Sequence, residues 1–153
     1  MLLRVRDQAL AASGLMTPTV GGPSVKTYQP PGIWEEATFG KKTYVQDHGE
    51  ALYRRTLYVF WRRIVGPTML FDNSTRQVCA VKATRTNTPL HALVTLNDTT
   101  YVEAARVLAE KVLISPGDDS QHLQHAFHIV TNRDAKGEEL AVLQKQLAKL
   151  RPQ

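Results

Sequence analysis

The sequence is nearly without cysteine. Cys79 is the only one in 153 residues, so this chain cannot form an intrachain disulfide, a tetrahedral cysteine zinc site or a covalent haem link through a Cys-x-x-Cys-His motif. Cys79 stands between Val78 and Ala80, with no histidine near it in the sequence. Because a reactive thiol needs a base or a positive charge beside it, we interpret Cys79 as a buried, inert thiol.

Long apolar runs are also missing. No stretch reaches the roughly 18 apolar residues that a membrane-spanning helix needs, so no membrane span is expected. The opening residues MLLRVRDQAL do not form a signal peptide, because Arg4, Arg6 and Asp7 interrupt the apolar region that such a peptide requires. The sequence alone therefore predicts either a protein that is not exported or a piece of a longer protein whose signal lies upstream.

Acidic residues are the scarcer charge. The chain has 14 Asp and Glu against 19 Lys and Arg, which gives a net charge of +5. The excess lies in residues 1–100, with 12 basic and 7 acidic residues, whereas residues 101–153 hold 7 of each. A basic region can attract nucleic acid, acidic glycans or an anionic partner, but it is also compatible with an ordinary surface.

Amphipathic patterns predict an all-α fold, a bundle of five or six helices. The whole chain, 1–153, is expected to be one helical domain, with an irregular loop at 13–46 and a helical core at 47–151. Helices are expected over 2–12, 52–65, 89–97, 101–114, 120–132 and 137–150. The expected start and stop signals are Asp47 with Glu50, Thr88 with Pro89, Asn97 in a left-handed conformation, Thr100 with Glu103, and Asp118 or Asp119.

The apolar patterns also predict which helix faces are buried. Residues 52–65 are apolar or aromatic over most of a helical wheel, which is typical of a central helix in a bundle. The expected buried residues of the later helices are Tyr101, Ala105, Leu108, Ala109 and Val112, then Leu123, Ala126, Phe127 and Val130, then Leu140, Leu143, Leu147 and Leu150.

Proline and glycine are concentrated in residues 13–46 and prevent a regular helix there. A loop of this length is unusual in a small domain, so it is expected either to be functional or to lie along a surface that anchors it. The expected anchors are Val25, Tyr28, Ile33 and Trp34.

Five blocks of the sequence together resemble a known family. They are RDQALAASGL, GGPSVKTYQPPGIWEE, GEALYRRTLYVFWRR, TRTNTPLHALVTLND and YVEAARVLAEKVL. They are similar to the planctomycete-specific domain at the C-terminal end of large proteins that carry planctomycete cytochrome c domains. The resemblance covers nearly the whole chain. It departs at His91, where glutamine is expected, and at IVGPTMLFD, a variant of a more proline-rich turn.

The resemblance implies a context rather than a reaction. Such proteins are large, multidomain and exported, so the resemblance implies a periplasmic or cell-surface location. Haem c is expected only in an upstream domain, and no cofactor is expected in this chain. The family brings no catalytic residues that could be carried over to this sequence.

The leading interpretation of function is a structural and interaction module without catalytic activity. The chain would dock against upstream domains of the same polypeptide or against a protein partner, because the apolar helix 52–65 and the long loop both need a covering surface. The expected interaction surface consists of Trp34, Tyr28, Arg54, Arg55 and Arg62.

Two alternatives belong to other classes. Basic and aromatic residues interleave in 52–65, as in surfaces that contact phosphates and stack on bases. Arginine stems that pack along apolar surface give the same pattern, so nucleic acid is ranked last among the partners. In the enzymatic alternative, the segment contributes Arg85, Asn87, Asn97 and Asp72 to a cleft shared with a missing upstream domain.

Arg85, Thr86 and Asn87 are the candidate ligand site, because they precede the helix expected to begin at Pro89. Free N–H groups and the helix dipole favour an anion there, such as sulfate, phosphate or a partner's carboxylate. The simpler interpretation is that Thr86, Asn87 and Thr88 only cap the helix and hold the loop.

His122, His125 and His128 follow one another at intervals of three residues. Histidines on neighbouring helical turns can share a metal, and His122 and His125 are the weak candidates. The buried face of this helix is expected on its other side, which would leave the histidines in solvent. No metal site is therefore predicted.

Overall fold

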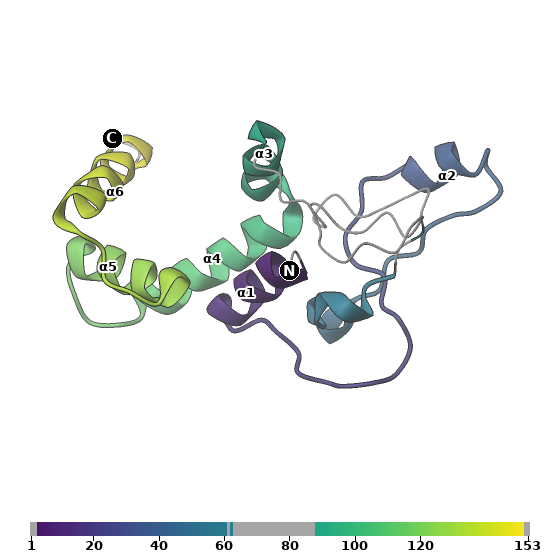
Figure 1. Cartoon of the computed structure of the whole chain (residues 1–153), viewed down its shortest axis with the longest axis horizontal. Coiled ribbons are helices and arrows are strands. Elements are labelled where there is room, and N and C mark those ends of the chain that lie inside the picture. Colours follow the sequence, from purple (N-terminus) through teal and green to yellow (C-terminus); the bar gives the residue numbers. More distant parts are fainter. Residues whose placement is uncertain (1–2, 61, 63–87, 152–153) are drawn as a thin grey trace, which may run out of the picture.

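The computed structural model describes residues 3–60, 62 and 88–151 (Figure 1). In these residues the chain forms six α-helices, two short 3₁₀ helices and no strand beyond isolated bridges. The predicted all-α fold with a long Pro/Gly-rich loop is thus confirmed. The elements are α1 (Leu3–Ser13), α2 (Ile33–Ala37), η1 (Gly49–Tyr53), η2 (Thr56–Tyr58), α3 (Pro89–Asn97), α4 (Thr99–Leu113), α5 (Asp119–Thr131) and α6 (Gly137–Leu150).

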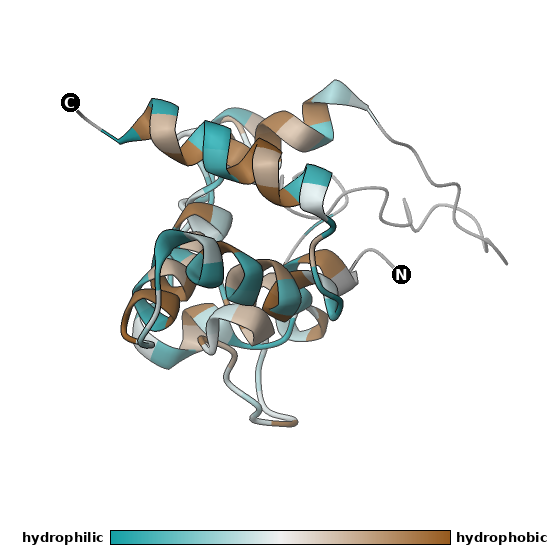
Figure 2. Ribbon diagram, turned by 90° about the vertical axis from the view of Figure 1, so that its left-hand side faces the viewer, coloured by the Kyte–Doolittle hydropathy of each residue, from teal (hydrophilic) through white to brown (hydrophobic). Residues whose placement is uncertain are grey.

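One half of the molecule is made of α1 and α3–α6, and we call it the helical half. In it α4 packs against α1, α3 and α5, and α6 packs against α5 (Figure 1). The buried residues of this core are Leu10 on α1 and Tyr101, Ala104 and Val112 on α4. The helices in Figure 2 carry hydrophobic and hydrophilic residues together, as surface helices with one apolar stripe do.

The later helices begin and end close to where the sequence predicts. Residues 137–150 form α6 as expected, and α5 differs from the prediction by one residue at each end. Asp118 caps α5, because its carboxylate accepts the Gln121 N–H at 2.8 Å and the Gln121 side chain accepts the Asp118 N–H at 3.0 Å. These signals are readable because a cap and its helix are neighbours in sequence.

Two expected signals around the α3–α4 corner are wrong. Asn97 does not adopt a left-handed conformation, but ends α3 with its Nδ2 donating to the Leu93 carbonyl at 2.7 Å. The N-cap of α4 is Asp98 rather than Thr100, and its carboxylate accepts the Thr100 N–H at 2.9 Å. Thr88 does precede α3 as N-cap residue with Pro89 following, but its side chain makes no capping hydrogen bond.

The helix predicted over 52–65 is wrong as far as Phe60. Leu52, Arg54 and Thr56 are buried, whereas Arg55 and Leu57 are exposed, so the segment alternates with a period of two. It forms only the short helices η1 and η2, with extended backbone between and after them. Tyrosine, threonine, valine and phenylalanine favour such extended backbone. Apolar residues stand on the exposed side as well, such as Leu57, so they spread around a helical wheel and imitate a central helix.

The predicted capping box at Asp47 and Glu50 is wrong for a related reason. The Asp47 carboxylate accepts the Lys26 N–H at 2.7 Å, and the Asp47 N–H donates to the Lys26 carbonyl at 2.9 Å. The residue that precedes η1 is His48, without a side-chain cap. Asp47 therefore joins the loop to the segment after it instead of starting a helix.

Residues 14–60 form the second half, which we call the loop half. Residues 17–25 lie alongside residues 53–60 and run parallel to them. The Thr17 N–H donates to Tyr53 at 3.0 Å, and Val25 exchanges backbone hydrogen bonds with Tyr58 and Phe60 at 2.8 and 2.7 Å. The long loop thus pairs with the segment that was predicted to be helical.

The core of the loop half is aromatic. Trp34 of α2 is buried and stacks on Tyr44 and Phe60, with ring centroids 5.5 and 5.7 Å away. Val25, Leu52 and Val59 are buried as well. Of the four predicted anchors, Val25 and Trp34 are buried, and Tyr28 and Ile33 are partly buried.

Arg6 and Asp7 of α1 join the two halves. Arg6 is fully buried, and its guanidinium donates to the carbonyls of Leu52 at 2.6 Å and Arg54 at 2.8 Å and to the Thr56 hydroxyl at 3.3 Å. The Asp7 carboxylate accepts the Thr56 N–H at 2.7 Å and the Thr56 hydroxyl at 2.6 Å. Burial lowers the pKa of Arg6, and the charge of Asp7 opposes that shift.

The outer helices contribute little to the core. Neither α5 nor α6 has a fully buried residue, so the buried faces predicted for them are only partly covered. On α4, Tyr101 and Val112 are buried as predicted, whereas Ala105 and Ala109 are exposed. Among the helices described, none combines the length and the hydropathy needed to cross a bilayer.

Candidate functional site

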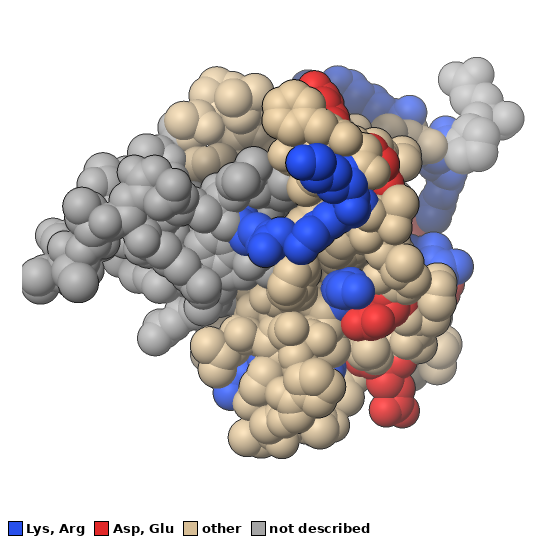
Figure 3. All heavy atoms as spheres, turned by 90° about the vertical axis from the view of Figure 1, so that its right-hand side faces the viewer, with Lys and Arg blue, Asp and Glu red and all other residues tan. Residues whose placement is uncertain are grey.

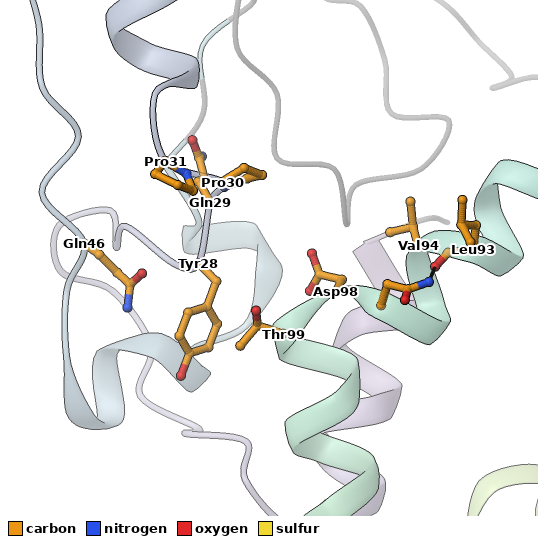
Figure 4. A pocket seen from close by; sticks show the side chains of 10 residues that line it. Tyr28, Gln29, Pro30, Pro31, Gln46, Leu93, Val94, Asp98 and Thr99 are labelled. Atoms are coloured by element: carbon orange, nitrogen blue, oxygen red, sulfur yellow. Dashed lines mark hydrogen bonds between the residues drawn. The ribbon is translucent and has the colours of Figure 1, made fainter.

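A hollow lies where the loop half meets the α3–α4 corner. It has a volume of about 750 Å³. Its walls come from the turn at 28–31 and Gln46 of the loop half, from α3, and from the first residues of α4 (Figure 4). The described lining residues are Tyr28, Gln29, Pro30, Pro31, Gln46, Leu93, Val94, Asn97, Asp98 and Thr99.

A second hollow of about 370 Å³ adjoins the first and shares Tyr28, Asn97 and Thr99 with it. Its other described lining residues, Val102, Glu103 and Arg106, lie on α4. Because three residues line both hollows, the two adjoin, and we call them together the corner groove. The volume of the larger part lies within the ~300–1,000 Å³ usual for ligand sites.

Glu103 holds the wall between the hollows in place. One carboxylate oxygen accepts the Tyr53 hydroxyl at 2.8 Å, and the other accepts the Tyr28 hydroxyl at 3.2 Å. Burial, together with the neighbouring Glu103, raises the pKa of both phenols above its ordinary value. Both phenols therefore stay protonated through neutral pH and act as donors to Glu103, which ties α4 to two segments of the loop half.

Several polar groups in the groove keep unused hydrogen-bonding capacity. The Gln46 amide and the Thr99 hydroxyl make no hydrogen bond with any residue that the structure describes. The side-chain Nδ2 of Asn97 donates to the Leu93 carbonyl at the end of α3. The side-chain oxygen of Asn97 makes no hydrogen bond with the described residues, so it can accept one from a ligand. In Figure 4 the Tyr28 ring lies between Gln46 and Thr99. The groove thus offers both donors and acceptors beside an aromatic ring.

The described lining residues are mostly polar and carry few charges. The lining contains amides, hydroxyls, two carboxylates and one guanidinium, and no cysteine, histidine, lysine or serine within the described part of the chain.

The residues of the expected interaction surface do not share one face. Trp34 and Arg54 are buried, with 4% and 8% of their surface exposed. Tyr28 is partly buried in the corner groove, whereas Arg55 and Arg62 are exposed. Only the last three of these five residues are accessible to a partner.

Arg54 has an internal role that explains its burial. Its guanidinium donates to the carbonyls of Pro23 at 2.9 Å, Thr19 at 3.3 Å and Gly21, and it lies 4.2 Å from the centre of the Tyr58 ring. Loop carbonyls without partners in a helix or sheet need such donors when they are buried. Arg54 therefore stabilises the turn at 19–23 from within.

Acidic residues accompany the basic ones on the outer surface of the loop half. In Figure 3, Lys and Arg side chains on the described part of this face lie beside Asp and Glu side chains. Exposed Arg55 pairs with Asp7, with 3.8 Å between Nε and Oδ2. This mixture, together with the burial of Arg54, weakens the case for phosphate binding through 52–65.

The expected anion site cannot be placed. Arg85, Thr86 and Asn87 lie outside the described residues, as do Asp72 and Cys79. Of the residues expected in a shared enzymatic cleft, only Asn97 is described, and it lines the corner groove.

The three histidines differ in burial and in their hydrogen-bond partners. His122 is partly buried and its Nε2 lies 2.9 Å from the Ser115 carbonyl, whereas His128 lies 2.9 Å from an Asp134 carboxylate oxygen. His125 is exposed, and together with His128 it lines a hollow between α5 and α6. No group of three or more potential metal ligands occurs among the residues that the structure describes.

Most of the groove could not be found from the sequence. Tyr28 and Asn97 were candidates for other reasons, whereas Gln46 has no local signal. Glu103 was predicted to cap α4, and the apolar stripe of that helix placed it on the solvent side. Its partners Tyr28 and Tyr53 are 75 and 50 residues away in the chain, and no helical period reports such contacts.

The comparisons with known proteins give a family but no function. No curated protein and no solved structure matches the chain. A family model described as "PSD1: Protein of unknown function (DUF1553)" matches residues 3–147. The match covers both halves of the molecule and the corner groove. The chain therefore belongs to this PSD1 family of proteins of unknown function.

Proposed function

We propose that this chain is a non-catalytic structural and interaction module that docks against an upstream domain of the same polypeptide. In this proposal, that polypeptide is a large exported protein whose haem c lies in a separate upstream domain. The context comes from the family resemblance described above. The docking comes from an observation on the chain itself, the uncovered face of α3.

The α3 helix supports the docking through its exposure. Leu90, Leu93 and Leu96 follow one another at intervals of three residues and are 68%, 57% and 73% exposed. The helix buries none of its nine residues, although its average composition is strongly apolar. Contiguous leucines on one helical face are typical of a surface that a partner covers.

An apolar helix or groove of the upstream domain is the occupant that fits this face. The three leucines carry no charge, and the next residue on the same side is Asn97, so the contact would be mainly hydrophobic. Covering the leucines would stabilise the complex by about 25 cal/mol for each Å² of apolar surface removed from water.

The test is binding between this chain and the separately produced upstream part of the polypeptide. We expect a complex by isothermal titration calorimetry, and at least a roughly tenfold weaker one for the double variant Leu90→Ser/Leu96→Ser, because two central apolar contacts are lost. Leu57→Ser is the matched control, since Leu57 is equally exposed at 69% but lies on the loop half.

Three results would contradict the proposal. They are no binding of the upstream part, equal binding by the double variant, and a stable dimer of this chain that the double variant abolishes. The last result would assign the leucine face to a second copy of the chain. Leu90 and Leu96 do not line the corner groove, so this test does not touch the groove.

A further inference from the structure

The corner groove has the chemistry of a site for a small polar ligand. We propose that it binds a neutral oligosaccharide. This goes beyond docking through α3, because it assigns a ligand class to a different surface. The argument rests on the hydrogen-bonding groups of the groove, its flat apolar surfaces, its charge and its shape.

The free polar groups match sugar hydroxyls. A hydroxyl donates one hydrogen bond and accepts others, so a sugar needs donors and acceptors side by side. The Gln46 amide and the Thr99 hydroxyl supply both kinds and are not used by other described residues. The side-chain oxygen of Asn97, which no described residue uses, adds an acceptor on the α3 side of the groove.

The apolar surfaces match the C–H faces of a sugar ring. The Tyr28 ring lies between Gln46 and Thr99 (Figure 4). Its hydroxyl is fixed by Glu103 at 3.2 Å. Pro30 and Pro31 extend this wall with two rigid rings. A pre-positioned flat wall lowers the entropy lost when a rigid ring binds against it.

Charge argues against an anionic ligand. Asp98 is the only charged residue among the described lining residues of the larger hollow, and it is negative. The smaller hollow holds Glu103 and Arg106, and the Arg106 guanidinium also lies 3.7 Å from Glu110. A phosphate or sulfate would meet two carboxylates and one partly engaged cation, whereas a neutral ligand avoids this repulsion.

Shape and secondary structure separate a sugar from a peptide. The two adjoining hollows form a depression that suits a short chain of units rather than a single one. An extended peptide commonly binds by adding a strand to a sheet edge. Between the described segments of this protein no sheet exists, so that mode of peptide binding has no edge to use there. Amides and hydroxyls beside an aromatic ring favour the oligosaccharide.

The experiment is calorimetric titration of the full chain with three neutral hexasaccharides, built from glucose, mannose and xylose. A uronic-acid hexasaccharide and a decaproline peptide serve as competing ligand classes. We expect at least one neutral hexasaccharide to bind, and the two competitors not to bind.

Variants locate the site. Gln46→Ala removes an amide that has no partner among the described residues, so we expect the fold to be retained. Affinity for the sugar should drop roughly five- to tenfold, as for loss of one or two hydrogen bonds. Tyr28→Phe keeps the ring and removes the hydroxyl, with a smaller loss. Gln146→Ala is the matched control, because Gln146 is exposed on α6 far from the groove and should change nothing.

The proposal is overturned if none of the three hexasaccharides binds, if Gln46→Ala binds the sugar as well as the unaltered chain does, or if decaproline binds and displaces the sugar. The last result would make the groove a peptide site. Circular dichroism of each variant shows whether the fold is intact, so a loss of binding is attributed to the groove only when the spectrum is unchanged.

Discussion

The helical half and the loop half of this protein satisfy their backbones in different ways. In the helical half, N–H and C=O groups pair within each helix, and the helices are joined by apolar contacts around Leu10 and Ala104. In the loop half, residues 14–60 have only short helices and isolated bridges. There the buried carbonyls depend on side chains, chiefly the guanidinium groups of Arg6 and Arg54.

This difference predicts which substitutions destabilise each half most. A helix keeps its own hydrogen bonds when one side chain is shortened, so the helical half should respond mostly to loss of apolar volume. A loop stabilised by a few buried donors loses several hydrogen bonds with one of them. The loop half should therefore lose most stability when its buried polar residues are replaced. Replacements of polar residues on protein surfaces are usually tolerated.

The largest effect is expected from Arg6→Met. The change leaves two buried carbonyls and the Thr56 hydroxyl without their donor and removes the charge opposite Asp7. Breaking a buried, hydrogen-bonded charged group costs about 3–5 kcal/mol of unfolding free energy. Urea denaturation followed by circular dichroism and Trp fluorescence measures the loss.

Arg151→Met is the control for Arg6. Like Arg6, Arg151 donates more than one hydrogen bond. Its two bonds go to the Asp119 carboxylate, and its side chain is 63% exposed. Exposed ion pairs contribute less than about 1 kcal/mol. Equal losses of unfolding free energy for the two variants would mean that the buried donor stabilises no more than an exposed one. That result would contradict the difference between the two halves.

A smaller loss is expected from Leu10→Ala in the helical half. Leu10 is fully buried between α1 and α4, and removing a buried leucine side chain costs about 2–4 kcal/mol through lost apolar contact and the cavity left behind. Leu150→Ala on α6 should change the unfolding free energy by less than about 0.5 kcal/mol, because Leu150 is 79% exposed. Thermal unfolding ranks the two variants, and similar melting temperatures would contradict the placement of the core.

A still smaller effect is expected from Gly32→Ala in the loop half. Gly32 precedes α2 with φ of 83°, where a side chain is strained, although no atom lies within 4 Å of the added carbon. The cost is about 1–2 kcal/mol from the backbone alone. Gly137→Ala at the start of α6 has open space and no positive φ, so it should be neutral or stabilising. Chemical denaturation of both variants compares the same Gly→Ala change in the two halves. Equal changes of unfolding free energy would contradict the strain at Gly32.

The smallest effect is an electrostatic one on the outer helices. Hydrogen bonds from the Arg133 side chain and the Lys136 N–H lower the pKa of Glu139 from 4.5 to about 2. Since the pKa is lower in the folded state, this interaction stabilises the protein above pH 4.5 and is lost as the pH falls toward 2. Arg133→Gln should raise the pKa of Glu139 toward 4.5, measured by NMR titration of the side-chain carboxyl.

Lys149→Gln is the control for that titration, because Lys149 lies on the same helix but makes no contact with Glu139 among those described. A pKa of Glu139 that stays near 2 without Arg133 would show that the backbone N–H alone sets it. The outer helices would then depend on their caps more than on ion pairs.

The same contrast explains how much of the fold could be predicted. The bounds of α5 and α6 follow from caps and spacings within a few residues, such as Asp118 with Gln121. The prediction for residues 52–60 was wrong because the residues that pack on this segment, Arg6 and Val25, lie 27 or more residues away in the chain. Asp47 and Glu50 have the spacing of a helix cap, but Asp47 pairs with Lys26, and no local pattern distinguishes the two uses.

The candidate site was harder to predict than the fold for the same reason. Tyr28, Gln46 and Glu103 meet only after the loop half has packed against α4. Sequence periodicity showed the apolar side of α4 around Tyr101, and it assigned Glu103 to the opposite side. Two phenols from distant segments cover that carboxylate, and neither has a pattern that indicates its partner.

The placement of Arg6 and Asp7 has a practical consequence for dividing this protein. Gly14 looks like a natural boundary, because α1 ends there and the irregular segment begins. Yet a shortened form beginning at Gly14 would be deprived of the cation and the carboxylate that organise residues 52–56, although both belong to the opposite half. Anyone wishing to study residues 14–60 in isolation should carry the first helix along with them.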